Sequence, residues 1–270
     1  MSISIERVRL HETKLIGLMQ DVRGGNIWLW RTVVAMLVGS ALMLALQYFD
    51  LRLINGVNVW DKPAKFFLSL AVQYGSVSWA LAQLPMMERT KRSINWATWL
   101  MLIAGWAEMG YIIFRASRGE ASHFNTSTLF AAIAYPLMGI GALTLTFTAA
   151  FIGWRIWAQR RIGLWADAAG LGLMVGALLG TIAGAYMSAH NGHWVGGAQT
   201  DAGGLPLFNW SVTGGDLRVA HFVGLHAAQF IPLAALSGDR RVVYGVAVAL
   251  TLLTTITFVM GASGVPIFRT

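Results

Sequence analysis

Seven long apolar stretches constrain this chain more than any other feature of its sequence. Each stretch runs for about 20 residues, the length that an α-helix needs to cross the roughly 30 Å hydrocarbon core of a bilayer. Of the 270 residues, 56% are hydrophobic and only 12% are charged, whereas about 25% are charged in an ordinary soluble domain. The sequence therefore predicts an all-α integral membrane protein with a bundle of seven transmembrane helices.

The predicted spans are separated alternately by short basic turns and by longer segments rich in Gly, Asn and His. We expect the spans at Trp28–Phe49, Ala64–Leu84, Trp96–Phe114, Thr128–Ile152, Leu164–Ser188, Leu217–Leu236 and Val243–Ser263. The longer segments are Asp50–Pro63, Arg115–Ser127 and Ala189–Asp216, all on one side of the bundle. No internal repeat is visible, so residues 28–270 are expected to form a single transmembrane domain.

Lysine and arginine are distributed unequally between the two sides of the predicted bundle. Thirteen lie on the side of the N-terminus and seven on the other. By the positive-inside rule, the N-terminus is expected in the cytoplasm and the C-terminus outside a bacterial inner membrane. Residues 1–27 are expected to form a cytoplasmic segment with an amphipathic helix on the membrane surface. Anionic lipids then account for the net charge of +8, and no nucleic-acid partner is expected.

Four glycines spaced by four residues lie on one face of the fifth predicted span. They are Gly172, Gly176, Gly180 and Gly184. A flat stripe of this kind lets the backbone of a neighbouring helix approach closely. Packing of this kind is the favoured interpretation, and the alternatives are that the stripe accommodates a planar cofactor or a lipid, or holds a second copy of the chain in an oligomer.

Histidine is the most informative residue type, because five of the six histidines fall in the half of the bundle away from the N-terminus. The chain has no cysteine, so a metal ion would need His, carboxylate, Met or carbonyl ligands. His221 and His226 are five residues apart, about 140° around a helix, and cannot grip one ion as a one-turn pair. The candidate metal ligands are His123, His190, His193, His221 and His226.

Carboxylates and arginines accompany these histidines. Glu120, Asp216 and Glu108 are the candidate catalytic carboxylates, and Glu108 lies inside the third span, where an acidic side chain is costly unless it is protonated or paired. Ser122 is a candidate cap for the fourth span. Arg115, Arg118, Arg218 and Gln229 are the candidate cofactor-binding residues, and the arginines could pair with haem propionates. Asp61, Lys62 and Lys65 are interpreted as anchors at the membrane interface.

Two stretches carry a resemblance to known sequences. GGLPLFNWSVTGGDLRVAHFVGLHAAQFIPL (203–233) and RGEASHFN (118–125) resemble segments of a family of bacterial polytopic membrane proteins. The resemblance implies a multi-pass protein of the bacterial inner membrane over most of the chain. It implies no particular activity and assigns no functional residues.

Three hypotheses of function remain open. The first is a membrane oxidoreductase that holds haem b or a histidine-bound Zn, Cu or Fe ion in the outer leaflet. The second is a zinc-dependent hydrolase that acts on a lipid-like or small-molecule substrate, with Glu120 or Asp216 as general base. The third is a non-enzymatic transporter, receptor or assembly protein in which the histidines relay protons or bond between helices.

Overall fold

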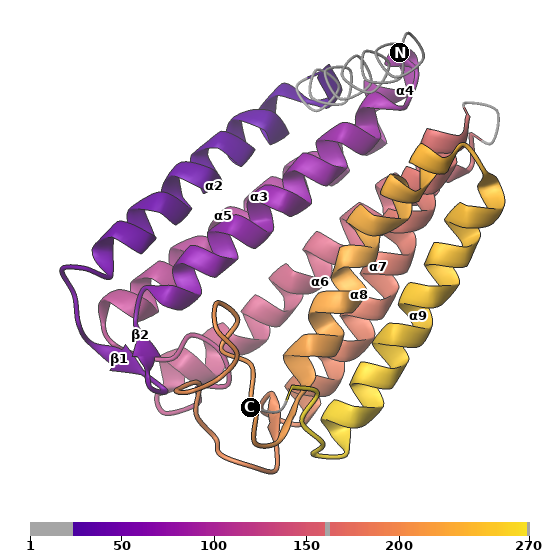
Figure 1. Cartoon of the computed structure of the whole chain (residues 1–270). Helices are drawn as coiled ribbons and strands as arrows, with labels where there is room; N and C mark the ends of the chain where they lie inside the picture. Colours follow the sequence, from indigo (N-terminus) through magenta and orange to yellow (C-terminus); the bar gives the residue numbers. More distant parts are fainter. Residues whose placement is uncertain (1–23, 160–162, 269–270) are drawn as a thin grey trace, which may run out of the picture.

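Long helices, arranged roughly side by side, make up most of the molecule (Figure 1). The computed structural model describes residues 24–159 and 163–268. The helices are α2 (Ile27–Leu46), α3 (Asp61–Ala82), α4 (Met86–Arg89), α5 (Arg92–Ser117), α6 (Leu129–Trp157), α7 (Leu164–Ala189), α8 (Leu217–Leu233), the 3-10 helix η1 (Ala234–Ser237) and α9 (Arg240–Ala262). The strands are β1 (Leu53–Ile54), β2 (Val57–Asn58), β3 (Trp194–Val195) and β4 (Gly215–Asp216).

The connections between the long helices gather at two unlike ends (Figure 1). One end, here called the short-turn end, contains residues 24–26, 83–91 and 238–239. The opposite end, here called the loop-rich end, contains residues 47–60, 118–128, 190–216 and 263–268. Two antiparallel strand pairs, β1 with β2 and β3 with β4, order the loop-rich end, and the helical pattern of the sequence did not predict them.

Among the described residues, six helices are long and apolar enough to cross a membrane. They are α2, α5, α6, α7, α9 and the continuous helical segment of α8 and η1. Helix α3 has 22 residues but is less apolar, because polar side chains such as Gln73, Ser76 and Ser78 occur along it. The chain is therefore a polytopic helical membrane protein.

Each predicted span corresponds to a long helix, but some boundaries differ. Helix α5 continues to Ser117, so Arg115 lies in its last turn and not in a loop. The α-helical geometry of α8 ends at Leu233, one residue after Pro232, and continues as the 3-10 helix η1. The amphipathic helix expected within residues 3–23 lies outside the described residues.

The glycine stripe of α7 packs against α8 of the same chain. A Cβ atom added at Gly172 would meet the ring of Pro232, and one at Gly180 would collide with Leu225. At Gly176 it would lie 2.9 Å from the carbonyl oxygen of Leu225. Glycine therefore serves the close approach of these two helices. The stripe is covered within the chain, so the expectation that it joins two copies is corrected.

A continuous apolar core fills much of the interior of the bundle and extends from Phe67 and Met109 to the short-turn end. It draws on α2, α3, α5, α6, α7 and α8, and its fully buried members include Leu29, Leu81, Ile94, Met101, Ile152, Ile156 and Leu173. Burying a Leu, Ile or Met side chain contributes about 1.5–3 kcal/mol when the alternative is water. Since lipid is also apolar, close packing is the main contribution of this core within a bilayer.

Candidate functional site

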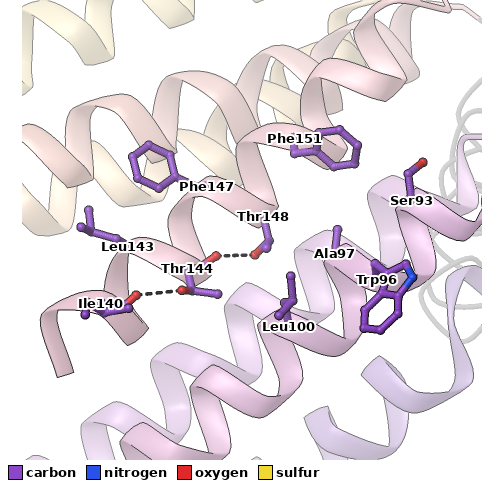
Figure 2. A pocket seen from close by; sticks show the side chains of 10 residues that line it. All are labelled: Ser93, Trp96, Ala97, Leu100, Ile140, Leu143, Thr144, Phe147, Thr148 and Phe151. Atoms are coloured by element: carbon purple, nitrogen blue, oxygen red, sulfur yellow. Dashed lines mark hydrogen bonds between the residues drawn. The ribbon is translucent and has the colours of Figure 1, made fainter. Parts of the chain in front are cut away.

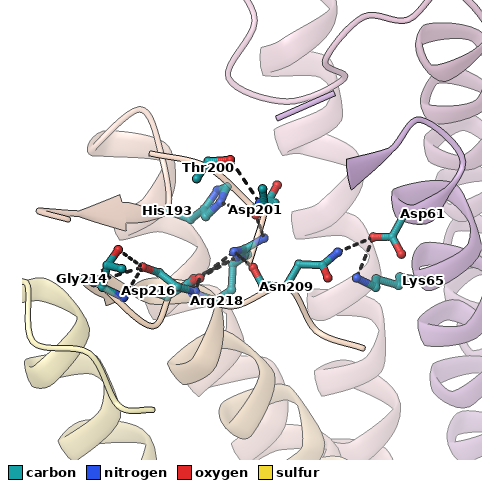
Figure 3. Close-up of polar contacts among 12 residues, drawn as sticks. Asp61, Lys65, His193, Thr200, Asp201, Asn209, Gly214, Asp216 and Arg218 are labelled. Atoms are coloured by element: carbon teal, nitrogen blue, oxygen red, sulfur yellow. Dashed lines mark hydrogen bonds and ion pairs between the residues drawn. The ribbon is translucent and has the colours of Figure 1, made fainter. Parts of the chain in front are cut away.

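Arg218 joins two acidic side chains at the loop-rich end, where α8 begins (Figure 3). Asp216 caps α8 by accepting a hydrogen bond from the backbone N–H of Arg218, and its carboxylate also accepts from the guanidinium at 2.6 and 2.9 Å. The guanidinium lies 2.8 Å from Asp201 Oδ1 as well. Asp216 is only 2% exposed, and a buried carboxylate needs such a partner. The loop 190–216 is thereby fixed to the start of α8.

The same network extends across the molecule to α3. Arg218 donates to the backbone carbonyl of Asn209 at 2.7 Å, and the Asn209 side chain donates to Asp61 Oδ2 at 2.9 Å. Asp61 also pairs with Lys65, one turn along α3, at 2.7 Å (Figure 3). Asp61 and Lys65, which the sequence indicated as membrane anchors, therefore also take part in a polar network between two distant helices.

Lys62 lies near the centre of the charged groups at this end. Its ammonium nitrogen is 3.1 Å from Nδ1 of His123, and the charges of Asp201, Arg218 and Glu108 all act on it. Lys62 forms no ion pair with any side chain in the described part of the chain. A half-buried ammonium group without a carboxylate partner is unusual, because a cation removed from water normally requires compensation.

His123 faces Lys62 from the loop between α5 and α6. Burial, together with the positive charge of Lys62, holds the pKa of His123 well below its usual value. A protonated lysine can only donate, so Nδ1 of His123 accepts the hydrogen bond and the ring proton lies on Nε2. Ser122 also reaches Nδ1, at 3.1 Å, and it does not cap α6, because Thr128 fills that role.

His193 approaches the same region from the loop after α7. Its ring lies 4.0 Å from that of Trp194, and its Nε2 atom is 3.8 Å from Asp201 Oδ1, too long for a hydrogen bond. That Nε2 atom is buried and has no hydrogen-bond partner among the described residues. Burial lowers the pKa of His193, and the nearby Asp201 carboxylate opposes this effect.

Phe124 separates the two histidines and adopts a strained backbone conformation. Its ring centroid lies 6.4 Å from that of His123 and 6.2 Å from that of His193. Its φ angle is +55°, in the left-handed region that costs a non-glycine residue about 1–2 kcal/mol. Strain of this kind persists only where the surrounding contacts impose it, and it is commonly found at functional sites.

A hydrogen-bonded chain links α8 to α3 deeper in the molecule. Ser76 donates to the carbonyl of Val72 at 2.8 Å and accepts from the Gln229 amide at 2.8 Å. The Gln229 oxygen therefore faces Nδ1 of His226, 3.0 Å away, and this nitrogen must be the donor. In the neutral ring, Nε2 of His226 is left without a proton.

The remaining histidines have separate surroundings. His221 donates from Nδ1 to the carbonyl oxygen of Gly180 at 2.9 Å, an interhelical bond between α8 and α7. His190 lies on the surface with its ring parallel to that of Tyr186. Within residues 24–159 and 163–268, no three His, Asp or Glu side chains are grouped where one metal ion could contact them all. The five candidate ligands share one half of the molecule but do not converge.

The candidate carboxylates also lie apart from one another. Glu120 pairs with Arg115 at 2.7 Å and with Arg118 at 3.2 Å, so two arginines share one carboxylate at the end of α5 and the trio carries a net charge of +1. Arg115 is 3% exposed. Glu108 is 5% exposed on α5, and it approaches Gly141 of α6 so closely that a Cβ atom there would crowd its carboxyl group.

Lys62, Asp201 and Asn209 are site residues that sequence reasoning missed or interpreted differently. Lys62 resembles an ordinary interfacial anchor, and its sequence neighbours do not reveal that it faces His123. Asp201 and Asn209 lie in the long segment 190–216, whose path depends on the β3–β4 pair and on Arg218. The only sequence signal was the unusual length and polarity of that segment.

Comparisons with protein-family models, with curated proteins and with solved structures found nothing that matches this chain. The side chains themselves are therefore the basis on which a function can be inferred. At the loop-rich end they form a polar region in which Arg218 is fully paired and Lys62 is not.

Proposed function

We propose that this protein binds a small molecule bearing a carboxylate or phosphate group at the loop-rich end, as a membrane receptor or carrier. The observation that carries the proposal is the ammonium group of Lys62, which has His123 as its hydrogen-bond partner and no ion pair among the described residues. An anionic oxygen would supply the missing partner. The neutral His123 ring, which carries its proton on Nε2, offers a second donor to the same ligand.

The arrangement of polar and apolar residues supports a site that is open on one side. Polar side chains occur inward from Lys62 at Glu108 and at the Ser76–Gln229–His226 chain, and apolar core residues such as Leu81, Ile94 and Ile156 lie beyond them at the short-turn end. Charged and polar groups at membrane depth mark ligand pathways more often than structural positions. A polar path through the whole molecule would favour a channel, and the core interrupts such a path.

The orientation belongs to the same proposal. We infer seven spans, with α3 as the seventh, and the short-turn end in the cytoplasm, because thirteen of the twenty lysines and arginines belong to the cytoplasmic side in this arrangement. The chain has no cysteine, so a thiol reagent can label only the single cysteine that is introduced. In sealed right-side-out vesicles, an impermeant thiol reagent should label Ala198→Cys and leave Ser237→Cys unlabelled. The reverse result would overturn the orientation.

The binding proposal is tested with Lys62→Gln and its matched control Lys65→Gln. Lys65 lies on the same helix but is already paired with Asp61. In purified protein, titration calorimetry with small carboxylates and phosphate monoesters should identify a ligand. Lys62→Gln should then weaken its binding about tenfold or more, while Lys65→Gln should have a much smaller effect. Equal effects of the two variants would refute the assignment to Lys62.

A second candidate, the haem or metal oxidoreductase, is favoured by the orientation of His221 and His226. Each ring donates from Nδ1, to Gly180 and to Gln229 respectively, which leaves Nε2 free, as in many metal-bound histidines. A Soret band, or stoichiometric Fe, Cu or Zn that His226→Ala removes, would support this candidate. A colourless, metal-free protein purified from membranes would refute it. The zinc hydrolase stays a prediction that no particular contact favours.

A further inference from the structure

A groove runs between α5 and α6 on a part of the surface separate from the Lys62 site (Figure 2). Its volume is about 620 Å³, within the range of roughly 300–1,000 Å³ that is usual for small-molecule sites. Its walls include Trp96, Ala97 and Leu100 of α5 and Leu143, Phe147 and Phe151 of α6. Five of these six side chains are apolar throughout, and Trp96 presents a large aromatic ring.

The hydroxyl groups in the groove are already satisfied. Thr144 donates to the carbonyl of Ile140 at 2.8 Å, and Thr148 donates to that of Thr144 at 2.6 Å (Figure 2). At the end of the groove, Ser93 accepts a hydrogen bond from Arg155 at 3.0 Å. The walls therefore suit a flexible apolar occupant, because they present few hydrogen-bonding groups that a polar ligand could use.

The groove has the length of one membrane leaflet. Along α6 it extends from Ile140 to Phe151, which at 1.5 Å per residue is about 17 Å. Half of a hydrocarbon core about 30 Å thick is about 15 Å. The groove lies in the half of these helices that leads to the short-turn end, where α5 begins and α6 ends. An acyl chain of the leaflet on that side would match its extent.

Cationic side chains lie where the groove meets the short-turn end. Arg92 is one turn before Trp96 on α5, and Arg155 is one turn after Phe151 on α6, so each shares a helix face with a groove wall. Arg155 and Lys91 share a single carboxylate, that of Glu88, and Arg92 is exposed without an ion pair among the described residues. Three cations against one anion leave an excess of positive charge at this position.

We propose that the groove holds an acyl chain of an anionic phospholipid, with its phosphate bound by Arg92 and Arg155. The apolar walls and the leaflet-length extent account for the chain, and the adjacent charge accounts for the headgroup. Trp96, at 58% exposure, would lie at the level of the headgroups, where tryptophan side chains concentrate in membrane proteins. The site does not depend on the proposed function, because none of its residues belongs to the Lys62 region.

The headgroup part is tested by native mass spectrometry of the protein released from membranes that contain phosphatidylglycerol and phosphatidylcholine. Wild type should retain phosphatidylglycerol preferentially. Arg92→Gln should lower the retained fraction about fivefold, since one basic residue near an anionic surface contributes about 1 kcal/mol. Arg241→Gln, an exposed arginine on α9 at the same end, should leave it unchanged. No preference between the two lipids, or equal effects of the two variants, would overturn the proposal.

The acyl-chain part is tested with a phosphatidylglycerol that carries a diazirine on one chain. After irradiation, adducts should concentrate at residues 96–100 and 143–151. Leu143→Trp should fill the groove and reduce them, whereas Leu137→Trp, on an exposed part of α6 outside the groove, should not. Adducts spread evenly over the lipid-facing helices, or cross-links that join two copies of the chain at α5 and α6, would overturn the proposal.

Discussion

The two ends of the molecule stabilise the same helices by different means. At the short-turn end, Arg89 of α4 donates to backbone carbonyls of Leu84 and Ala82, at the end of α3, and of Gly24, before α2. This one side chain joins both segments to α4, next to a continuous apolar core. At the loop-rich end, ion pairs such as that between half-buried Arg218 and buried Asp216 hold the loops in place. The first arrangement gives close packing, and the second gives a polar interior at the cost of desolvation.

Backbone strain follows the same division. All five described non-glycine residues with positive φ lie at the loop-rich end: Asn55, Phe124, Asn191, Leu207 and Asn209. Three are asparagines, which tolerate this conformation, but Phe124 and Leu207 do not adopt it readily. Three of the four buried charged residues in the described part of the chain, Glu108, Arg115 and Asp216, also lie toward this end, against Asp167 at the other. Backbone strain together with this buried charge indicates that the loop-rich end is adapted to a task other than stability.

The largest expected effect is that of removing Arg218. Arg218→Gln leaves the buried carboxylate of Asp216 and the half-buried carboxylate of Asp201 without their shared cation, so we expect a loss of about 3–5 kcal/mol in unfolding free energy. Arg118→Gln is the control, because Arg118 is exposed and pairs only at the surface, where an ion pair contributes about 0–1 kcal/mol. Chemical unfolding in detergent micelles measures both. Similar losses of unfolding free energy in the two variants would show that the ion pairs of Arg218 stabilise the loop-rich end no more than a surface ion pair does.

A core substitution near the short-turn end should separate stability from binding. Ile152 is fully buried, and Ile152→Ala should cost about 3 kcal/mol through lost packing and the cavity that remains. Ligand affinity at the Lys62 site should be unchanged when it is measured well below the melting temperature. A large loss of affinity would mean that the two halves are coupled and that the contrast between them is too simple.

Acidification should weaken the loop-rich end selectively. The pKa values of His123 and His193 are lowered in the folded protein, so below about pH 6.5 the unfolded chain takes up protons that the folded one does not. As the pH is lowered below about 6.5, the free energy of unfolding should decrease by up to about 1.4 kcal/mol per pH unit for each of these two histidines. Thermal unfolding between pH 7.5 and 5.0 measures this slope. His123→Gln should flatten it, and a similar flattening by His190→Gln would contradict the explanation.

The smallest expected effect concerns Leu207, which is 76% exposed and has a φ angle of +71°. Leu207→Asn should relieve strain without losing packing and stabilise the protein by about 0.5–1 kcal/mol. Leu51→Asn is the matched control, an exposed loop leucine with no positive φ, and should change stability little. Destabilisation by Leu207→Asn would mean that this side chain has a contact partner in the membrane.

Much of the helical arrangement could be predicted from the sequence, because apolar length and glycine spacing are local signals. The close contact of Gly172 and Gly176 with α8 follows from their spacing of four. The extension of α5 through Arg115 could not be predicted, because it depends on the pairing of that arginine with Glu120. Nor could the β3–β4 pair be predicted, since two-residue strands carry no periodicity.

The site could be predicted only as a region. Histidine counting placed five candidate ligands toward the loop-rich end, where these side chains lie in the structure, but hydropathy does not specify which way each ring points. His221 faces the backbone of α7, and His226 faces Gln229, so neither contacts His123. The unpaired state of Lys62 emerges only when α3, α5, α8 and two loops are assembled around it.

The most direct test of the contrast between the ends compares two positions one turn apart on α3. Ser76 belongs to the polar chain with Gln229, and Ala80 is buried in the apolar core. In this cysteine-free chain, Ser76→Cys should react with a small charged thiol reagent added on the side of the loop-rich end, and Ala80→Cys should not react from either side. We expect the polar interior to be accessible to solvent only at the loop-rich end. Equal reactivity of the two variants, or reaction of Ser76→Cys only from the side of the short-turn end, would contradict this expectation.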